Sequence, residues 1–317
     1  MKAHGFILAL LTAILAAYLF PQGPDILPLK KITDIGIGFI FLFYGLKLSP
    51  SQFKMGFLNY KVHILIQLTT FIAFPLMAFL FLPFFEEGTN SQIWLALFFL
   101  AALPSTVSSS IVMVALAKGN LPTAIFNASL SGLIGILVTP LWMSFFMNSV
   151  SELKFGEVLG KLFLQIILPL VLGLLLQRIL GELARKYSRQ LSFFDKSIII
   201  LIVYSSFCTS FTSDLFETVS MWEFAKLVGL IVVLFVVIYT GLGWVSKALG
   251  FNTEDSITAK FCGTKKSLVH GSVMVKIIFG NSANTGLLLL PIMTYHILQL
   301  LVIAVIAERY GRRSQGD

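Results

Sequence analysis

The chain alternates long apolar stretches with short polar ones along its whole length. The apolar stretches are about 18–25 residues long, the length that a helix needs to cross the hydrocarbon core of a bilayer. Such lengths are typical of spanning helices, whereas the strands of a membrane barrel are about half as long. We therefore predict an all-α polytopic membrane protein of ten transmembrane helices, at about 4–20, 32–48, 62–82, 92–118, 121–147, 157–180, 196–213, 222–249, 256–279 and 284–307.

Composition supports a membrane protein and excludes a soluble one. Of the 317 residues, 57% are hydrophobic and 12% are charged, and the mean hydropathy is +0.90. Soluble domains carry roughly 25% charged residues. The net charge of +8 does not indicate nucleic-acid binding, because the basic residues lie in short loops between apolar stretches, where the positive-inside rule places them.

Loop charges predict the orientation. If the N-terminus is cytoplasmic, most basic residues fall on the cytoplasmic side, and the other side holds only Lys30, Lys31, Lys154, Lys161 and Lys226. This bias predicts a multi-pass protein of the inner (plasma) membrane with both termini in the cytoplasm. Residues 182–196 mix basic side chains with Leu and Phe, which is typical of an interfacial amphipathic linker.

Two predicted helices contain helix-breaking residues at matching positions. Residues 112–120 read VMVALAKGN and residues 273–281 read VMVKIIFGN, an offset of 161 residues. Each copy follows a break, near Pro104 in the fourth helix and near Gly263 in the ninth. Five helices separate the copies, so we predict a 5+5 inverted-topology repeat, with repeat one at 1–150 and repeat two at 151–310. Interrupted helices at matching positions indicate a binding site near the membrane midplane.

The ninth helix carries charge. A Lys at the centre of a membrane helix costs about 2.5–3.5 kcal/mol on insertion scales. Lys265 and Lys266 directly follow the break. Adjacent residues on a helix point about 100° apart, so we expect one lysine to reach the membrane surface and the other to face the interior. Thr264, Ser267 and His270 lie beside them.

Helices four and five supply hydroxyl and amide groups. Ser105, Thr106, Ser108, Ser109 and Ser110 follow the break of the fourth helix, and Thr123 and Asn127 lie in the fifth. Such groups can coordinate a small cation or donate to an anion. Alternatively, they bond within their own helix or to a neighbouring one.

Motifs for ATP hydrolysis or catalysis are absent. The sequence has no GxxxxGK[ST], HExxH or GxSxG pattern and no pair of carboxylates within an apolar stretch, so we predict no enzyme. The two cysteines, Cys208 and Cys262, form neither a disulfide framework nor a zinc pattern.

Several of these features together resemble the bile acid:sodium symporter family. They are the ten helices with two broken ones, the turn Ala117–Asn120, Pro140, and the segments FCGTKKSLVHG and FLFYGLKLS. The last two look like the divergent SBF-like bacterial branch. The resemblance implies one transporter domain over 1–317, with two crossing broken helices. It divides into a core (62–147 and 222–307) and a panel (4–48 and 157–213), with the solute bound between them.

The resemblance also implies sodium ligands, and the chain departs from that pattern. The fourth and fifth helices would supply ligands at Ser109, Ser110, Thr123 and Asn127. The ninth would supply a Glu where this chain has Phe261, and a Gln-Asn pair where it has Lys265-Lys266. We therefore expect no cofactor, keep sodium as a candidate ligand of those four residues, and do not expect the usual two-ion arrangement. One hypothesis is that Lys265 takes the place of a sodium ion; others are that it attracts an anionic substrate or gives up a proton during transport.

Together these inferences predict a secondary transporter that moves a small organic anion by alternating access across the lipid bilayer. The expected substrate-binding residues are Lys265, Lys266, Thr264, Ser267, Thr106, Asn127 and His270. The alternatives are a non-transporting membrane regulator or scaffold with the same fold, and a sodium-independent, proton-coupled carrier.

Overall fold

The computed structural model describes residues 3–48, 58–85, 89–146, 155–212, 220–280 and 285–313. Every regular element in these ranges is helical. Within them, six helices are long and apolar enough to cross a membrane: Tyr60–Phe84, Leu121–Ser144, Gly160–Lys186, Ser188–Thr212, Met221–Ala248 and Thr285–Arg312. The prediction of an all-α polytopic membrane protein is therefore confirmed.

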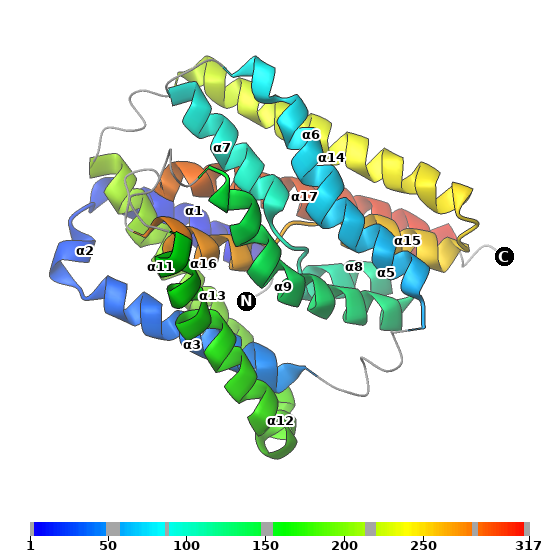
Figure 1. Cartoon of the computed structure of the whole chain (residues 1–317), viewed down its shortest axis with the longest axis horizontal. Coiled ribbons are helices and arrows are strands. Elements are labelled where there is room, and N and C mark those ends of the chain that lie inside the picture. Colours follow the sequence, from blue (N-terminus) through cyan, green and yellow to red (C-terminus); the bar gives the residue numbers. More distant parts are fainter. Residues whose placement is uncertain are drawn as a thin grey trace. The chain divides into compact units, whose positions relative to one another are not determined.

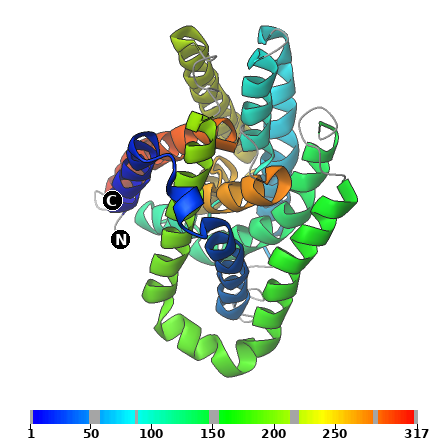
Figure 2. The same ribbon diagram turned by 90° about the vertical axis from the view of Figure 1, so that its left-hand side faces the viewer.

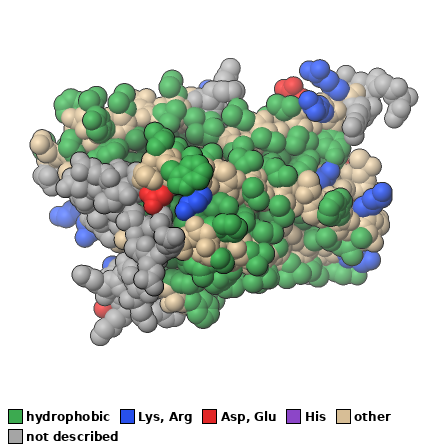
Figure 3. Space-filling view, turned by 90° about the horizontal axis from the view of Figure 1, so that it is seen from above, with side chains coloured by type: hydrophobic (Ala, Val, Ile, Leu, Met, Phe, Trp, Pro, Cys, Tyr) green, Lys and Arg blue, Asp and Glu red, His purple; other side chains and the backbone are tan. Residues whose placement is uncertain are grey.

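The outer surface fits a lipid environment. Figure 3 shows a face covered largely by hydrophobic side chains, with most of the visible Lys and Arg side chains toward its edges. Large apolar side chains are exposed on many helices, including Trp222 and Trp244 at 76% and 77%. In water such a surface would cause aggregation, whereas in a bilayer it faces acyl chains.

The described chain divides into two compact units, and the first contains residues 1–49, 144–219 and 272–289. Its helices are α1 (Ala3–Leu19), α2 (Gly23–Ile26), α3 (Leu29–Lys47), α11 (Phe155–Leu162), η3 (Phe163–Ile167), α12 (Leu168–Lys186) and α13 (Ser188–Thr212). In Figure 2, α12 runs to the lower end and turns sharply into α13.

Glycines allow two helices of the first unit to approach closely. A Cβ at Gly45 of α3 would collide with the carbonyl of Leu170 in α12, and one at Gly173 of α12 would collide with the carbonyl of Leu42. Small residues commonly mediate such backbone contact between membrane helices. At the end of α3, Lys47 forms an ion pair with Asp195 of α13 at 3.3 Å.

The second unit contains residues 50–143, 220–271 and 290–317. Its elements are α5 (Tyr60–Leu68), η1 (Thr69–Ala73), α6 (Phe74–Leu80), η2 (Leu82–Phe84), α7 (Thr89–Ala102), α8 (Ser108–Leu116), α9 (Leu121–Ser144), α14 (Met221–Ala248) and α15 (Thr253–Gly263). The beginning of α16 (Leu268–Phe279) and most of α17 (Thr285–Arg313) also belong to it. Helices α6, α7 and α14 lie side by side (Figure 1).

Some boundaries differ from the sequence-based expectation. The expected linker at 182–196 is helical, because α12 continues to Lys186 and α13 begins at Ser188. The third predicted helix contains a π-helical turn, η1, which ends two residues before Pro75.

The chain is interrupted at both predicted breaks. Between α7 and α8, residues 103–107 are not helical, and between α15 and α16, residues 264–267 are not helical. Pro104 lacks the N–H that would continue α7. At the second break, a Cβ on Gly263 would require the end of the Leu242 side chain of α14 to shift, since Cδ1 would lie 2.8 Å away.

Candidate functional site

The two helix breaks contact each other inside the second unit. The Ser267 N–H donates to the carbonyl of Pro104 at 2.9 Å, and the Ser105 hydroxyl donates to the carbonyl of Cys262 at 2.6 Å. Broken helices leave backbone groups without partners, and buried groups of this kind must find others. Each break therefore supplies donors to the carbonyls of the other.

Lys266 lies at the centre of this junction. Its ammonium donates to three carbonyl oxygens, those of Thr70 at 2.8 Å, Ala101 at 2.6 Å and Leu103 at 2.8 Å. On another side, Nζ lies 4.0 Å from the centre of the Phe74 ring. The residue is 1% exposed, so all three donors of the ammonium are used inside the protein.

Lys265 is equally buried, at 0% exposure, but has fewer partners. Its Nζ donates to the carbonyl of Ser109 in α8 at 2.7 Å. Among the described residues it makes no ion pair. Two of the three donors of this ammonium therefore have no acceptor in the described part of the chain.

The expectation that one lysine reaches the membrane surface is wrong, since both are buried. That expectation assumed helical spacing. Lys265 and Lys266 instead lie on the irregular segment between α15 and α16, so their side chains need not point about 100° apart as adjacent residues on a helix do.

The other predicted residues of this segment surround the lysines. Thr264 donates its hydroxyl to the carbonyl of Lys260 at 2.6 Å, and its own carbonyl accepts from Tyr295. The Ser267 hydroxyl accepts from the His270 N–H at 3.2 Å and lies 2.9 Å from His270 Nδ1. These bonds cap the first turn of α16 and fix the His270 ring.

Hydroxyl groups gather at the start of α8. Thr106 Oγ1 lies 2.7 Å from the Ser109 hydroxyl and 2.9 Å from the Ser110 hydroxyl. The Ser109 backbone also accepts from Lys265. The structure therefore brings Thr106, Ser109 and Ser110 to the same place as Lys265.

Asn127 and Thr123 form a separate group with α5. Asn127 Oδ1 accepts from Gln67 at 3.1 Å, and its Nδ2 lies 2.5 Å from His63 Nδ1. The same Nδ2 donates to the Thr123 carbonyl at 3.2 Å. Within the described residues, Asn127 makes no hydrogen bond to either lysine, so the predicted site residues fall into two groups.

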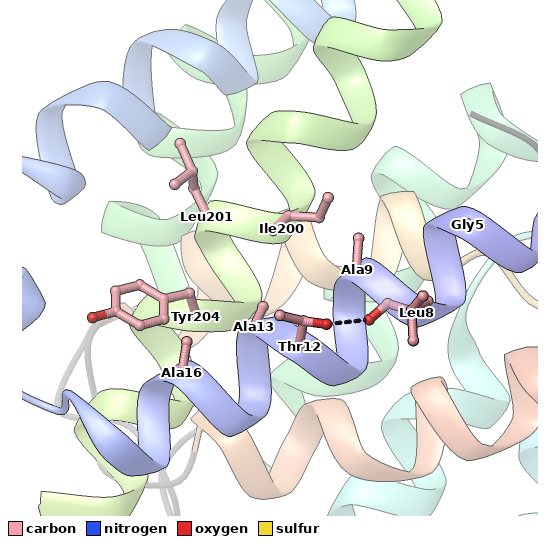
Figure 4. Close-up of a pocket in the computed structure, with 9 residues that line it drawn as sticks. All are labelled: Gly5, Leu8, Ala9, Thr12, Ala13, Ala16, Ile200, Leu201 and Tyr204. Atoms are coloured by element: carbon pink, nitrogen blue, oxygen red, sulfur yellow. Dashed lines mark hydrogen bonds between the residues drawn. The ribbon is translucent and has the colours of Figure 1, made fainter.

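A shallow groove in the first unit contains none of the predicted site residues. Figure 4 shows it between α1 and α13, where Thr12 bonds the Leu8 carbonyl of its own helix at 2.9 Å. Its lining is mostly apolar: Gly5, Leu8, Ala9, Thr12, Ala13, Ala16, Ile200, Leu201 and Tyr204.

Comparison with known proteins identifies the family. The sequence profile of the SBF-like CPA transporter family (DUF4137) matches residues 4–312. The chain belongs to this family. It is therefore a member of a transporter family and not an enzyme, and the resemblance drawn from the sequence is confirmed.

Relatives of this SBF-like transporter occur in bacteria and animals. The uncharacterized protein PA2026 of Pseudomonas aeruginosa is 36% identical over 313 residues, which cover 97% of this chain and 93% of the relative. The putative symporter YfeH of Escherichia coli is 32% identical over 98% of this chain and 93% of its own. Sodium/bile acid cotransporter 7-B of Xenopus laevis is 28% identical over 96% and 91%.

The residues that the resemblance implies as sodium ligands make two separate sets of hydrogen bonds. The Ser109 and Ser110 hydroxyls lie against Thr106, whereas Asn127 bonds Gln67 of α5 and donates to the Thr123 carbonyl of its own helix. Where three carbonyls converge, the Lys266 ammonium already fills the space between them. Among the described residues, no cluster of three or more His, Cys, Asp or Glu side chains could hold a metal ion.

Sequence reasoning missed several residues that shape the site. Gln299 of α17 donates to the Lys266 carbonyl and accepts from the Lys266 N–H, at 2.9 and 2.8 Å. Tyr295 lies one turn earlier on the same face and bonds the Thr264 carbonyl. Two polar residues spaced i, i+4 in an apolar helix were the available signal.

Proposed function

We propose that this protein is a secondary active transporter that moves a small organic anion by alternating access, with Lys265 as the residue that binds the negative charge. The observation that supports this proposal most is the position of the Lys265 ammonium. It is fully buried beside the two helix breaks, and only one hydrogen-bond acceptor, the Ser109 carbonyl, lies against it in the described part of the chain. An uncompensated buried ammonium costs several kcal/mol, and a bound anion would offset much of that cost.

Helix ends support an anionic solute at this place. Helices α8 and α16 begin at Ser108 and Leu268, directly after the two breaks. The N-terminus of a helix carries a partial positive charge, and half-helix N-termini in transporters are commonly directed at anionic groups. Ser267 and Thr106 add hydroxyl groups near these ends.

Sodium coupling is not part of this proposal. The names of the animal relatives describe sodium and bile acid transport by those proteins. In this chain, Phe261 and Lys265-Lys266 replace the acidic and amide positions that the resemblance implies. The proposal is a carrier whose solute is bound by charge and whose cycle does not require sodium.

The same proposal includes the membrane architecture. It has ten spans in two inverted repeats of five, a core at 62–147 and 222–307, a panel at 4–48 and 157–213, and cytoplasmic termini in the plasma membrane. The loop charges and the two interruptions at matching positions support it.

Solute counter-flow in proteoliposomes tests the function. The purified protein would be assayed against a panel of organic anions, with and without sodium and at two pH values. We expect counter-flow of at least one anion that is unchanged when choline replaces sodium. Absence of flux across the panel would favour the non-transporting scaffold, and flux that requires sodium would refute the coupling proposal.

A further inference from the structure

The structure assigns to Lys266 the role of a built-in cation: its ammonium occupies a monovalent cation position between α7 and the π-helical turn η1 and keeps sodium out of that position. This claim concerns a position distinct from the Lys265 ammonium and does not depend on which solute is carried. It can therefore fail or hold apart from the transport proposal.

The contacts of Lys266 suit a charged side chain better than a neutral one. The carbonyls of Thr70, Ala101 and Leu103 all lie within hydrogen-bond distance of Nζ. An ammonium has three N–H donors and no lone pair, so it satisfies all three. A neutral amine has two N–H donors, and its lone pair would face the third carbonyl oxygen.

The Thr70 carbonyl is free because of a local sequence feature. In the π-helical turn η1, the Phe74 N–H bonds the Thr69 carbonyl, five residues earlier. In the same register the next donor would be residue 75, and its acceptor would be Thr70. Residue 75 is proline and has no N–H, so the Thr70 carbonyl remains available to Lys266.

The break after α7 frees the other two carbonyls. A continuing helix would pair the Ala101 carbonyl with the Ser105 N–H, but that N–H donates to the Ser131 hydroxyl at 2.9 Å. The Leu103 carbonyl likewise has no helical donor, because residues 104–107 are not helical. The Lys266 ammonium donates a hydrogen bond to each of these two carbonyls.

The surroundings favour a cation in other ways. The C-terminus of α7 carries the partial negative charge of the helix dipole. The face of Phe74 covers the ammonium at 4.0 Å from the ring centre, a cation–π contact. Convergent backbone carbonyls are the groups that replace the hydration shell of alkali ions in selective sites. Lys266 thus takes a position with the chemistry of an alkali-ion site.

Removing the lysine side chain tests the inference. In Lys266→Ala the three carbonyls would lose their donor, and an added sodium or potassium ion could enter. We expect the Tm of purified Lys266→Ala to fall by several degrees in choline chloride. We expect about half of this loss to return, saturably, in sodium or potassium chloride of equal ionic strength, and also with propylammonium.

Matched variants distinguish the cation-dependent recovery of Tm in Lys266→Ala from a general effect of salt. Lys266→Gln keeps much of the side-chain volume and should be destabilised without a cation-selective regain. Lys265→Ala should also show none, because its ammonium has one acceptor. Equal Tm values for Lys266→Ala in choline, sodium, potassium and propylammonium salts would overturn the inference.

Wild-type protein provides a second test if Lys266→Ala does not fold. Its Tm should be the same in sodium and choline chloride at equal ionic strength. A saturable, sodium-selective rise in the wild-type Tm, retained in Ser110→Ala and Asn127→Ala but lost in Phe74→Leu, would place a sodium ion at this position and overturn the inference.

Discussion

Gln299 holds the backbone of Lys266 from both sides, since its amide group donates to the Lys266 carbonyl at 2.9 Å and accepts from the Lys266 N–H at 2.8 Å. Lys266 lies between α15 and α16, outside both helices. One side chain of α17 therefore replaces two backbone bonds, and the direction of the Lys266 side chain depends on it.

Replacing Gln299 should loosen this junction. Gln299→Leu leaves a buried N–H and a buried carbonyl without partners, each worth about 1–3 kcal/mol. We expect a loss of stability of about 2–6 kcal/mol, seen as a lower Tm in detergent. Gln190→Leu, at an exposed position of α13, is the control. Equal Tm values for the two variants would contradict the proposed role of Gln299.

Ser110 should not carry a sodium response. Its hydroxyl lies 2.9 Å from Thr106 Oγ1. The three carbonyls that could hold a cation, those of Thr70, Ala101 and Leu103, already accept from Lys266. We expect Ser110→Ala to have the same ratio of solute flux in sodium and choline buffers as the wild type. Sodium-stimulated uptake that disappears in Ser110→Ala would show that the hydroxyl is a sodium ligand.

The close approach of α3 and α12 predicts different outcomes for two glycines of one helix. In Gly45→Ala the new methyl group collides with the α12 backbone, whereas in Gly38→Ala the nearest atom is Cγ of Pro169 at 3.8 Å. Overpacking of this kind costs about 1–3 kcal/mol. Gly45→Ala should therefore have a lower Tm than the wild type and Gly38→Ala should not. Equal stability would mean that the helices can separate at little cost.

The ion pair in the first unit can be tested with a double-mutant cycle. Lys47 and Asp195 are 27% and 18% exposed, and the second oxygen of Asp195 is buried without a partner. Lys47→Met should cost about 1–3 kcal/mol because it leaves a partly buried carboxylate unpaired. Adding Asp195→Leu should restore part of that loss. If the two single effects simply add, the pair contributes no coupling energy.

The sequence predicts the helix breaks because each depends on residues at the break itself. Pro104 cannot donate a helical hydrogen bond, and Gly263, the last residue of α15, is a weak helix former. The apolar lengths likewise predict spanning helices, since the bilayer sets that length. These features are local, and the structure bears them out.

The different roles of the two lysines could not be read from the sequence. The partners of Lys266 lie far away along the chain, at Thr70, Ala101 and Leu103. Their availability depends on a π-helical turn and on the course of the chain after the break. The sequence-based hypothesis gave the place of a cation to Lys265, whereas in the structure the three carbonyls converge on Lys266.

The two groups of predicted site residues illustrate the same limit. Asn127 is a polar residue in an apolar helix, and the sequence predicts only that it needs partners. Those partners prove to be Gln67 and His63 of α5, and no pattern in α9 indicates which neighbouring helix would supply them.

The most direct test of the central claim is the apparent affinity for the anion found by counter-flow, compared between Lys265→Met and Lys247→Met. Both variants remove one positive charge, but Lys247 is exposed at the end of α14. We predict that Lys265→Met weakens the apparent affinity at least about tenfold, equivalent to about 1.4 kcal/mol, and that Lys247→Met does not change it. Equal affinities in the two variants, with both proteins folded, would contradict the assignment of Lys265 as the anion-binding residue.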